Sequence, residues 1–440
     1  MNKDISLAIT DSSGESKLQK TGILLFAGGI LSATIAAFGA GKAQPILFFW
    51  LSFGLVISGG LLYTYNYFQN INDIKNNGIF HNGMTNRGAI AWLVGLVFTG
   101  FYIILYWFPQ YLEVLIRMMD PFSWLLRSKA ADQWFLYGFI YTIAILVMGV
   151  RFIGKYRHSR YQIIRTCSIM FFQTGFAFLI PGILLKLNQP EFYFSYFWPL
   201  KYSYLWPNDV NYLFESGNIG YFMVFWGAIM TFIATPLLTY KYGKRWYCSF
   251  VCGCGGLAET LGDPYRQHSD KSIRAWKIER YLVHSILVFV ILTTILLWVN
   301  SVKGGSVLGN LSEGFAKSYG FFIGSIFSGV IGTGFYPIFG NRVWCRFGCP
   351  MAAILGIFQR FKSRFRITTN GGQCISCGNC STYCEMGIDV RAYAQKGENI
   401  VRASCVGCGI CSAVCPRGVL NLENLDEKGR FDGYVKPQIR

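Results

Sequence analysis

The chain has 440 residues, of which 52% are hydrophobic and only 14% are charged. Soluble globular domains carry about 25% charged residues, so this composition excludes an ordinary soluble protein and indicates a membrane protein. A formal charge of +18 would suit a nucleic-acid-binding protein. The basic residues fall in loops between apolar segments, however, so we expect no nucleic-acid partner.

The apolar segments predict an all-α polytopic membrane domain of about eight transmembrane helices. Each segment is close to the ~20 residues that cross the hydrocarbon core of a bilayer. Residues 1–20 are polar and are expected to form a cytoplasmic tail. The expected spans lie near residues 22–40, 46–67, 88–111, 134–152, 166–185, 219–240, 279–299 and 319–339.

The distribution of Lys and Arg predicts the orientation of these helices. With eight spans both termini lie on one side, and placing that side in the cytoplasm puts most Lys and Arg inside, including the runs at 151–165 and 241–246. Cytoplasmic loops of membrane proteins carry this excess. We therefore expect a multi-pass protein of a bacterial inner membrane, in contact with lipid.

A weak internal repeat links two cysteine loops. Residues 245–253 read RWYCSFVCG and residues 342–350 read RVWCRFGCP, and each follows a pair of expected spans. If the two hairpins pack together, four thiols converge: Cys248, Cys252, Cys345 and Cys349, with Cys254 beside them. Such a group could hold a further metal centre, act as a thiol relay, or simply pack.

Composition changes sharply after Phe365, where the apolar segments end. We expect a transmembrane domain over residues 21–358, a basic interfacial linker over 359–366, a small soluble domain over 367–420 and a C-terminal tail over 421–440. The linker, QRFKSRFR, alternates basic and apolar residues, as segments that lie on a lipid surface do.

Two cysteine runs in the soluble domain have the spacing of bacterial two-cluster ferredoxins, with two, two and three intervening residues. In such runs three thiolates hold one [4Fe-4S] cluster and the fourth reaches the other cluster. The spacing predicts a small α+β ferredoxin domain with two clusters. One is held by Cys374, Cys377, Cys380 and Cys415, and the other by Cys405, Cys408, Cys411 and Cys384.

Zinc and disulfides are the rival interpretations of these runs. Structural zinc sites usually have more widely separated cysteine pairs, and disulfides are disfavoured in a reducing cytosol. Both are therefore weaker than the cluster interpretation. Glu385 stands where a proline is usual after the first run, a departure that removes no ligand.

The expected periplasmic loop over residues 186–218 is strongly aromatic and contains FYFSYFWPLKYSYLWP. Aromatic side chains gather at the membrane–water interface, which is the simpler interpretation of this loop. The alternative is a docking face for a partner protein or a quinone.

CxxxC loops after membrane hairpins, followed by a two-cluster tail, resemble the membrane-bound polyferredoxins of the NapH/NosR type. The resemblance covers roughly the last 280 residues. It implies that the eight tail cysteines bind clusters, and that the protein is a quinol-linked electron donor in nitrate or nitrous-oxide reductase systems. The second loop has the CxxxCP form of that family, whereas Gly253 follows Cys252 in the first.

A relay is needed for electrons to cross the membrane, because a ~30 Å apolar core is too thick for direct transfer. Only His284 of the four histidines lies in an expected span, so the sequence offers no pair of haem ligands. Ionisable residues inside membranes tend to be functional. We therefore expect a quinone site at His284 and Glu279, with interfacial positioning as the alternative.

Two functional hypotheses follow. The first is a redox subunit of a respiratory oxidoreductase complex, rather than a stand-alone enzyme, which exchanges electrons with a quinone and with other redox subunits. The second is a maturation factor that handles copper or reduces a cofactor for another enzyme.

Overall fold

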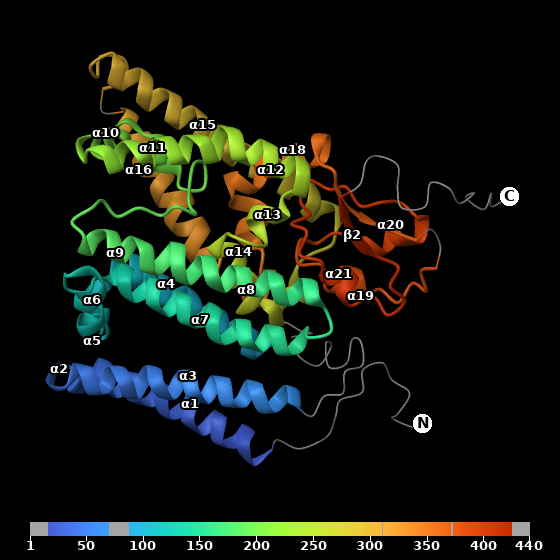
Figure 1. Cartoon of the computed structure of the whole chain (residues 1–440), viewed down its shortest axis with the longest axis horizontal. Coiled ribbons are helices and arrows are strands. Elements are labelled where there is room, and N and C mark those ends of the chain that lie inside the picture. Colours follow the sequence, from blue (N-terminus) through green and yellow to red (C-terminus); the bar gives the residue numbers. More distant parts are fainter. Residues whose placement is uncertain (1–15, 70–87, 310, 371–372, 425–440) are drawn as a thin grey trace.

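The computed structural model describes residues 16–69, 88–309, 311–370 and 373–424. Most of the predicted N-terminal tail, His81 and most of the predicted C-terminal tail lie outside these residues. The described chain is mainly helical, and its C-terminal ferredoxin-type region lies at one end of a bundle of long helices (Figure 1).

Seven helical segments of the described residues are long and apolar enough to cross a membrane, which confirms seven of the eight expected spans. Polar side chains fix several of their first turns: Ser16 forms a capping box with Gln19, and Asp132 and Ser272 cap the fourth and seventh segments. The segments are Lys17–Ala43, Pro45–Tyr67, Ala89–Trp107, Gln133–Lys155, Arg160–Lys186, Asn218–Tyr242 and Ile273–Val302.

The eighth expected span, 319–339, is not among these seven. The chain there forms α16 (Leu311–Ser318), the π-helix η8 (Tyr319–Ile331) and the short α17 (Tyr336–Phe339). Glycine and serine are frequent in this stretch, and they lower its hydropathy and weaken a regular helix. In Figure 1 this broken helix still runs back into the bundle beside α15.

The membrane part contains the following elements in chain order. They are α1 (Lys17–Ile35), η2 (Ala36–Ala40), α2 (Gly41–Ala43), α3 (Pro45–Gln69), α4 (Ala89–Trp107), η3 (Pro109–Leu112), α5 (Glu113–Met118), α6 (Asp120–Arg127), α7 (Gln133–Lys155), α8 (Arg160–Thr174), η4 (Gly175–Leu179), α9 (Ile180–Lys186), η5 (Tyr202–Leu205), α10 (Pro207–Glu215), α11 (Asn218–Ile229), η6 (Met230–Ala234), α12 (Thr235–Tyr242), α13 (Arg245–Cys248), α14 (Gly253–Thr260), η7 (Asp263–His268), α15 (Ile273–Val302), η9 (Trp344–Gly348) and α18 (Pro350–Lys362), together with α16, η8 and α17.

The aromatic loop that follows α9 is packed inside the protein rather than spread along a membrane interface. Phe192, Phe197 and Tyr204 are each at most 2% exposed. At its inner end the loop meets the first CxxxC hairpin, because the Tyr247 hydroxyl donates to the carbonyl oxygen of Ser195 at 2.7 Å. Irregular backbone at membrane depth is tolerated where protein surrounds it, and that is the situation here.

The ferredoxin-type region is small and α+β, as the cysteine spacing predicts. It contains α19 (Asn379–Thr382), α20 (Val390–Lys396), α21 (Ile410–Ala413) and a two-stranded antiparallel sheet of β1 (Phe365–Thr368) and β2 (Asn421–Asn424). Phe365 pairs with Asn424 and Thr368 with Asn421. The sheet therefore uses residues on both sides of the expected domain bounds, 367–420.

The basic segment 359–366 differs from the expected interfacial linker, since it forms the end of α18 and the start of β1. Gln359 is buried and its amide donates to the carbonyl oxygens of Arg402 and Cys405, each at 2.7 Å. Its carbonyl accepts from the backbone N–H of Lys244. These bonds join the membrane part to the ferredoxin region.

Candidate iron-sulfur centres

The two cysteine runs of the tail line two separate cavities. One cavity is lined by Cys374, Cys377, Cys380 and Cys415. The other is lined by Cys384, Cys405, Cys408 and Cys411. The structure thus brings together the two sets of four that the ferredoxin spacing predicts, with the fourth cysteine of each run beside the other three.

Glycines shape the loops that carry these thiols. Gly378 and Gly409 follow Cys377 and Cys408, and both have the left-handed backbone (φ 81° and 74°) that a side chain disfavours. Each starts a short helix whose first turn carries the next cysteine. The result is a tight loop that turns three thiols toward one cavity.

The described thiols are not gathered as closely as a zinc ion would hold them. A tetrahedral zinc ion with Zn–S bonds of 2.3 Å holds its sulfurs about 3.8 Å apart. Among the described residues, the one group of three or more ligand atoms within 4.8 Å of one another is Glu259, Glu385 and Cys408. No three cysteine sulfurs of the described chain are that close, whereas four thiols around an Fe₄S₄ cube lie further apart.

Burial keeps the metal-free thiols protonated. It raises the pKa of Cys380 and that of Cys405 to about 12. Because the thiolate is the metal ligand, cluster binding must release these protons.

The four cysteines of the CxxxC loops converge, and we call Cys248, Cys252, Cys345 and Cys349 the thiol site. All four are buried in one hydrophobic cluster. The thiol of Cys349 lies close enough to the other three for their charges to interact. The Cys254 thiol hydrogen-bonds with that of Cys252. The Sγ of Cys345 accepts from Arg342 at 3.6 Å.

The thiol site lies inside the membrane part and touches the second tail cavity. The re-entrant helix α14 packs through Gly256 on Ile145 of α7 and Ile169 of α8. Ile145 is ten residues from the end of α7 and Ile169 is nine residues from the start of α8, which is about 15 Å at 1.5 Å per residue. On the other side, the Ser249 hydroxyl donates to the carbonyl oxygen of Val406 at 2.8 Å, so residues next to Cys248 and Cys405 are in contact.

The first turn of α8, which belongs to the basic segment 151–165, holds the ferredoxin region in place. The Tyr161 hydroxyl donates to the carbonyl oxygen of Gly407, and the Gln162 amide donates to that of Cys408, each at 2.8 Å. A segment that the sequence marks only by its positive charge therefore carries, at the start of α8, contacts that dock the cluster domain.

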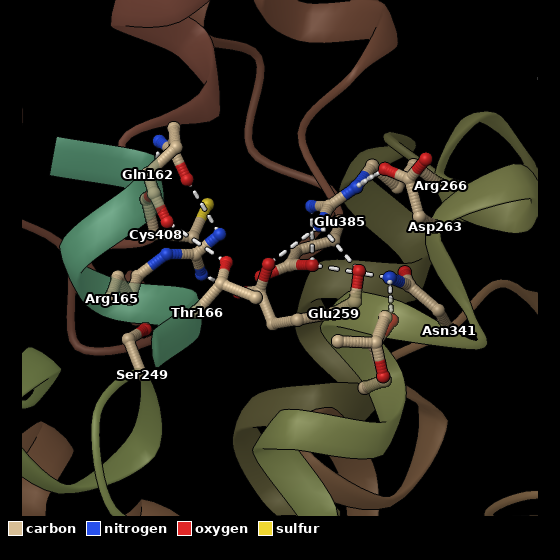
Figure 2. Close-up of polar contacts among 12 residues, drawn as sticks. Gln162, Arg165, Thr166, Ser249, Glu259, Asp263, Arg266, Asn341, Glu385 and Cys408 are labelled. Carbon is tan, nitrogen blue, oxygen red and sulfur yellow. Dashed lines mark hydrogen bonds and ion pairs between the residues drawn. The ribbon is translucent and has the colours of Figure 1, made fainter. Parts of the chain in front are cut away.

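A buried ionic network borders the second tail cavity, which Glu385 and Cys408 line (Figure 2). Glu259 of α14 pairs with Arg165, with Arg266 at 2.6 Å and with Arg342 at 2.5 Å. Glu385 pairs with Arg266 at 2.6 Å and with Arg342 at 3.0 Å. These five side chains are at most 1% exposed, so water screens none of the pairs.

Asp263 extends the network. It pairs with Lys155 at 2.6 Å and with Arg266 at 2.7 Å. Burial alone raises the pKa of its carboxyl, but Lys155 and Arg266 outweigh burial and lower that pKa below its ordinary value. Burial likewise raises the pKa of Glu259, and the three arginines hold it well below the usual range. These carboxyls are therefore ionised partners of the buried cations.

The residues of the expected quinone site, His284 and Glu279, line a cavity of about 690 Å³ between α15, α18 and the ferredoxin region. Glu279 is buried and pairs with Arg346 at 2.6 Å. We call this the cationic cavity, because its other lining residues include Lys244, Arg280, Arg346, Arg360 and Arg402. It also reaches Cys345 of the thiol site.

Sequence reasoning missed the ionic network. Glu259, Arg266 and Arg342 lie in or next to the cysteine hairpins, where charged residues are costly unless paired. Arg342 was noted as part of the repeat and Glu385 as a departure from proline, but the pairing of opposite charges from distant segments could not be read from either motif.

Three stretches of the chain match known protein families. A 4Fe-4S dicluster domain matches residues 373–420. A 4Fe-4S binding domain matches twice, at residues 224–272 and 319–368, and these matches contain the two CxxxC loops. The chain is therefore a multi-pass membrane protein that carries 4Fe-4S ferredoxin-type domains.

Two curated proteins are weakly similar to it. YccM of Escherichia coli (strain K12), whose name proposes an electron transport role, is 26% identical over 174 residues, which are 37% of this chain and 46% of YccM. The uncharacterized protein MJ0749 of Methanocaldococcus jannaschii is 25% identical over 172 residues, which are 37% of this chain and 59% of MJ0749. The chain thus spans about half the length of these relatives. No solved structure matches it.

Proposed function

We propose that this chain is a membrane-bound iron-sulfur electron-transfer protein, and that it serves as a redox subunit of a respiratory oxidoreductase system. The supporting observation is the order of its three cysteine groups. The thiol site lies inside the membrane part, the cavity at Cys405 contacts it through Ser249 and Val406, and the cavity at Cys374 ends at the exposed Cys377. A relay that passes single electrons from the membrane to the protein surface needs its centres in this sequence, each next to the one that follows it.

The eight tail cysteines would hold two [4Fe-4S] clusters, in the two sets that line the two cavities. The thiol site would hold a third iron-sulfur centre, which is supported by its four converging thiols and by the family match that spans both of its loops. Such clusters supply one-electron transfer. The protein supplies thiolates, a dry surrounding and a fixed spacing.

A quinol is the expected lipid-soluble redox partner, because the resemblance to NapH/NosR-type proteins implies one and the membrane part holds cavities that reach the thiol site. The cationic cavity at His284 and Glu279 is the place that the sequence favours. The surface end at Cys377 would face other redox subunits.

The expected location is a bacterial inner membrane with the ferredoxin region in the cytoplasm. The contact between that region and the start of α8, within the basic segment 151–165, supports this orientation, because the cytoplasmic ends of spans and their loops are the basic ones.

Anaerobic purification followed by metal analysis and low-temperature EPR tests the proposal. After reduction with dithionite we expect iron and sulfide in equal amounts, together with the signals of interacting [4Fe-4S] clusters. Zinc, copper or no metal in such material, without a cluster signal, would contradict the electron-carrier function.

A further inference from the structure

A second cavity, of about 420 Å³, lies in the membrane part on the side of the thiol site away from the ferredoxin region. We call it the aromatic cavity. Its walls come from α7, from the helix formed by α8 and η4, and from the buried aromatic loop, and they include Trp134, Tyr137, Tyr141, Gln173, Tyr196 and Cys254. Trp134 is 48% exposed at the end of α7, where tryptophan marks the membrane–water interface.

Gln173 has a buried carbonyl oxygen without a hydrogen-bond partner among the described residues. The side chain is only 4% exposed. Its amide N–H donates to Thr142 at 3.1 Å, and the Thr142 hydroxyl donates in turn to the carbonyl oxygen of Gly138 at 2.8 Å. The Thr142 hydroxyl can therefore only accept a hydrogen bond from Gln173. This fixes the Gln173 amide with its nitrogen toward Thr142 and its oxygen away from Thr142. A buried acceptor without a donor is costly.

The hydroxyl of Tyr196 lies beside this oxygen. A side chain built on Gly253 would collide with both groups, so the two polar atoms line one small space next to the CxxxC hairpin. The Tyr196 oxygen accepts from the backbone N–H of Gly253. An acceptor on Gln173 and a hydroxyl on Tyr196 together match a group that both donates and accepts, such as a phenolic hydroxyl.

The remaining walls narrow the ligand class. Aromatic side chains favour a flat aromatic ring. The cavity has one cationic lining residue, Lys201, so it does not suit a strongly anionic headgroup. Cys254 connects it to the thiol site through its hydrogen bond with Cys252.

We propose that the aromatic cavity binds the ring of a hydroquinone, with one ring hydroxyl donating to the Gln173 oxygen and accepting from Tyr196. This inference rests on the proposed function and moves the quinol from the cationic cavity to this one. Because Gln173 offers an acceptor only, the cavity distinguishes the reduced ligand, which carries O–H donors, from the oxidised quinone, which does not.

Calorimetric titration of the holoprotein in lipid nanodiscs with decylubiquinol and with decylubiquinone tests the proposal, with empty nanodiscs as the blank. The reduced form should bind about three- to tenfold more tightly, as one hydrogen bond allows. Gln173→Leu should remove this preference. Gly138→Leu, which places a side chain in the cavity, should abolish binding, whereas Gly175→Leu, at a glycine of the neighbouring helix with open space around it, should leave binding unchanged.

Iron is measured in every preparation, so that a failure of the electron-transfer function can be distinguished from a failure of the quinol site. Two results would overturn the aromatic cavity as the quinol site and leave the electron-transfer function standing. The first is full cluster content without quinol binding. The second is binding that survives Gly138→Leu and Gln173→Leu but is lost in His284→Ala. Protein that lacks clusters but binds quinol, and loses this binding in Gly138→Leu, would overturn the electron-transfer function and leave the aromatic cavity standing as the quinol site.

Discussion

Arg342 and Glu385 form an ion pair of 3.0 Å between the membrane part and the ferredoxin region, at a distance of 43 residues in the sequence. Glu385 follows a cluster cysteine, Cys384, and Arg342 contacts a thiol-site cysteine, Cys345. The pair therefore links the surroundings of two cysteine groups. It also gives a physical reason for a carboxylate at a position where two-cluster ferredoxins usually have proline.

Replacing Glu385 by Gln should loosen the ferredoxin region. The change leaves Arg266 and Arg342 buried with one carboxylate fewer, and removing one partner of a buried pair costs about 3 kcal/mol. The urea midpoint for loss of visible cluster absorbance should fall accordingly. Glu313→Gln, which breaks an exposed pair with Lys317, should not move that midpoint. Equal midpoints for both variants would show that the network does not stabilise docking.

Neutralising Arg165 should lower the reduction potential of the cluster at Cys408. The guanidinium acts on the charge of that thiolate, and a reduced cluster carries one more negative charge, which a nearby cation stabilises. For Arg165→Gln we expect a shift on the order of 50 mV to lower potential. Potentiometric EPR measures it. The cluster at Cys374 serves as internal control, and a shift of both clusters together would contradict a local effect.

The thiol site should contribute iron. Three [4Fe-4S] centres amount to about twelve iron atoms per chain and two to about eight. Cys345→Ser combined with Cys349→Ser should therefore lower the iron content by about a third while the tail-cluster signals persist. Cys167→Ser changes an exposed cysteine outside all three groups and should leave the iron content intact. Unchanged iron in the double variant would mean that these thiols only pack.

The sequence allowed much of the fold to be predicted, because its signals are local. Apolar runs identify seven spans, and the ferredoxin spacing pairs Cys415 with Cys374 and Cys384 with Cys405. Contacts between segments that are distant in the sequence could not be predicted from it. The aromatic loop looks the same whether it lies on lipid or packs inside the bundle, and the partners of Glu259 come from three segments that only the fold brings together. The glycines and serines of 319–339 lower its hydropathy, and the helix there ends at Ile331, so this stretch is not among the seven spans.

Close packing around Gly255 offers a further test of the thiol site, with little change in chemistry. A methyl group at this position would collide with the backbone carbonyl oxygen of Cys248 and lie 3.0 Å from a guanidinium nitrogen of Arg342. Gly255→Ala should therefore displace the backbone at Cys248 within the first hairpin and reduce the iron content as the double cysteine variant does. Gly100→Ala is the matched control, since its methyl group meets nothing within 4 Å and alanine favours a helix by about 1 kcal/mol over glycine. Iron analysis and EPR of the two variants, purified side by side, measure the difference. If Gly255→Ala retained all of its iron, the close packing of Gly255 on Cys248 would not be needed to form a centre.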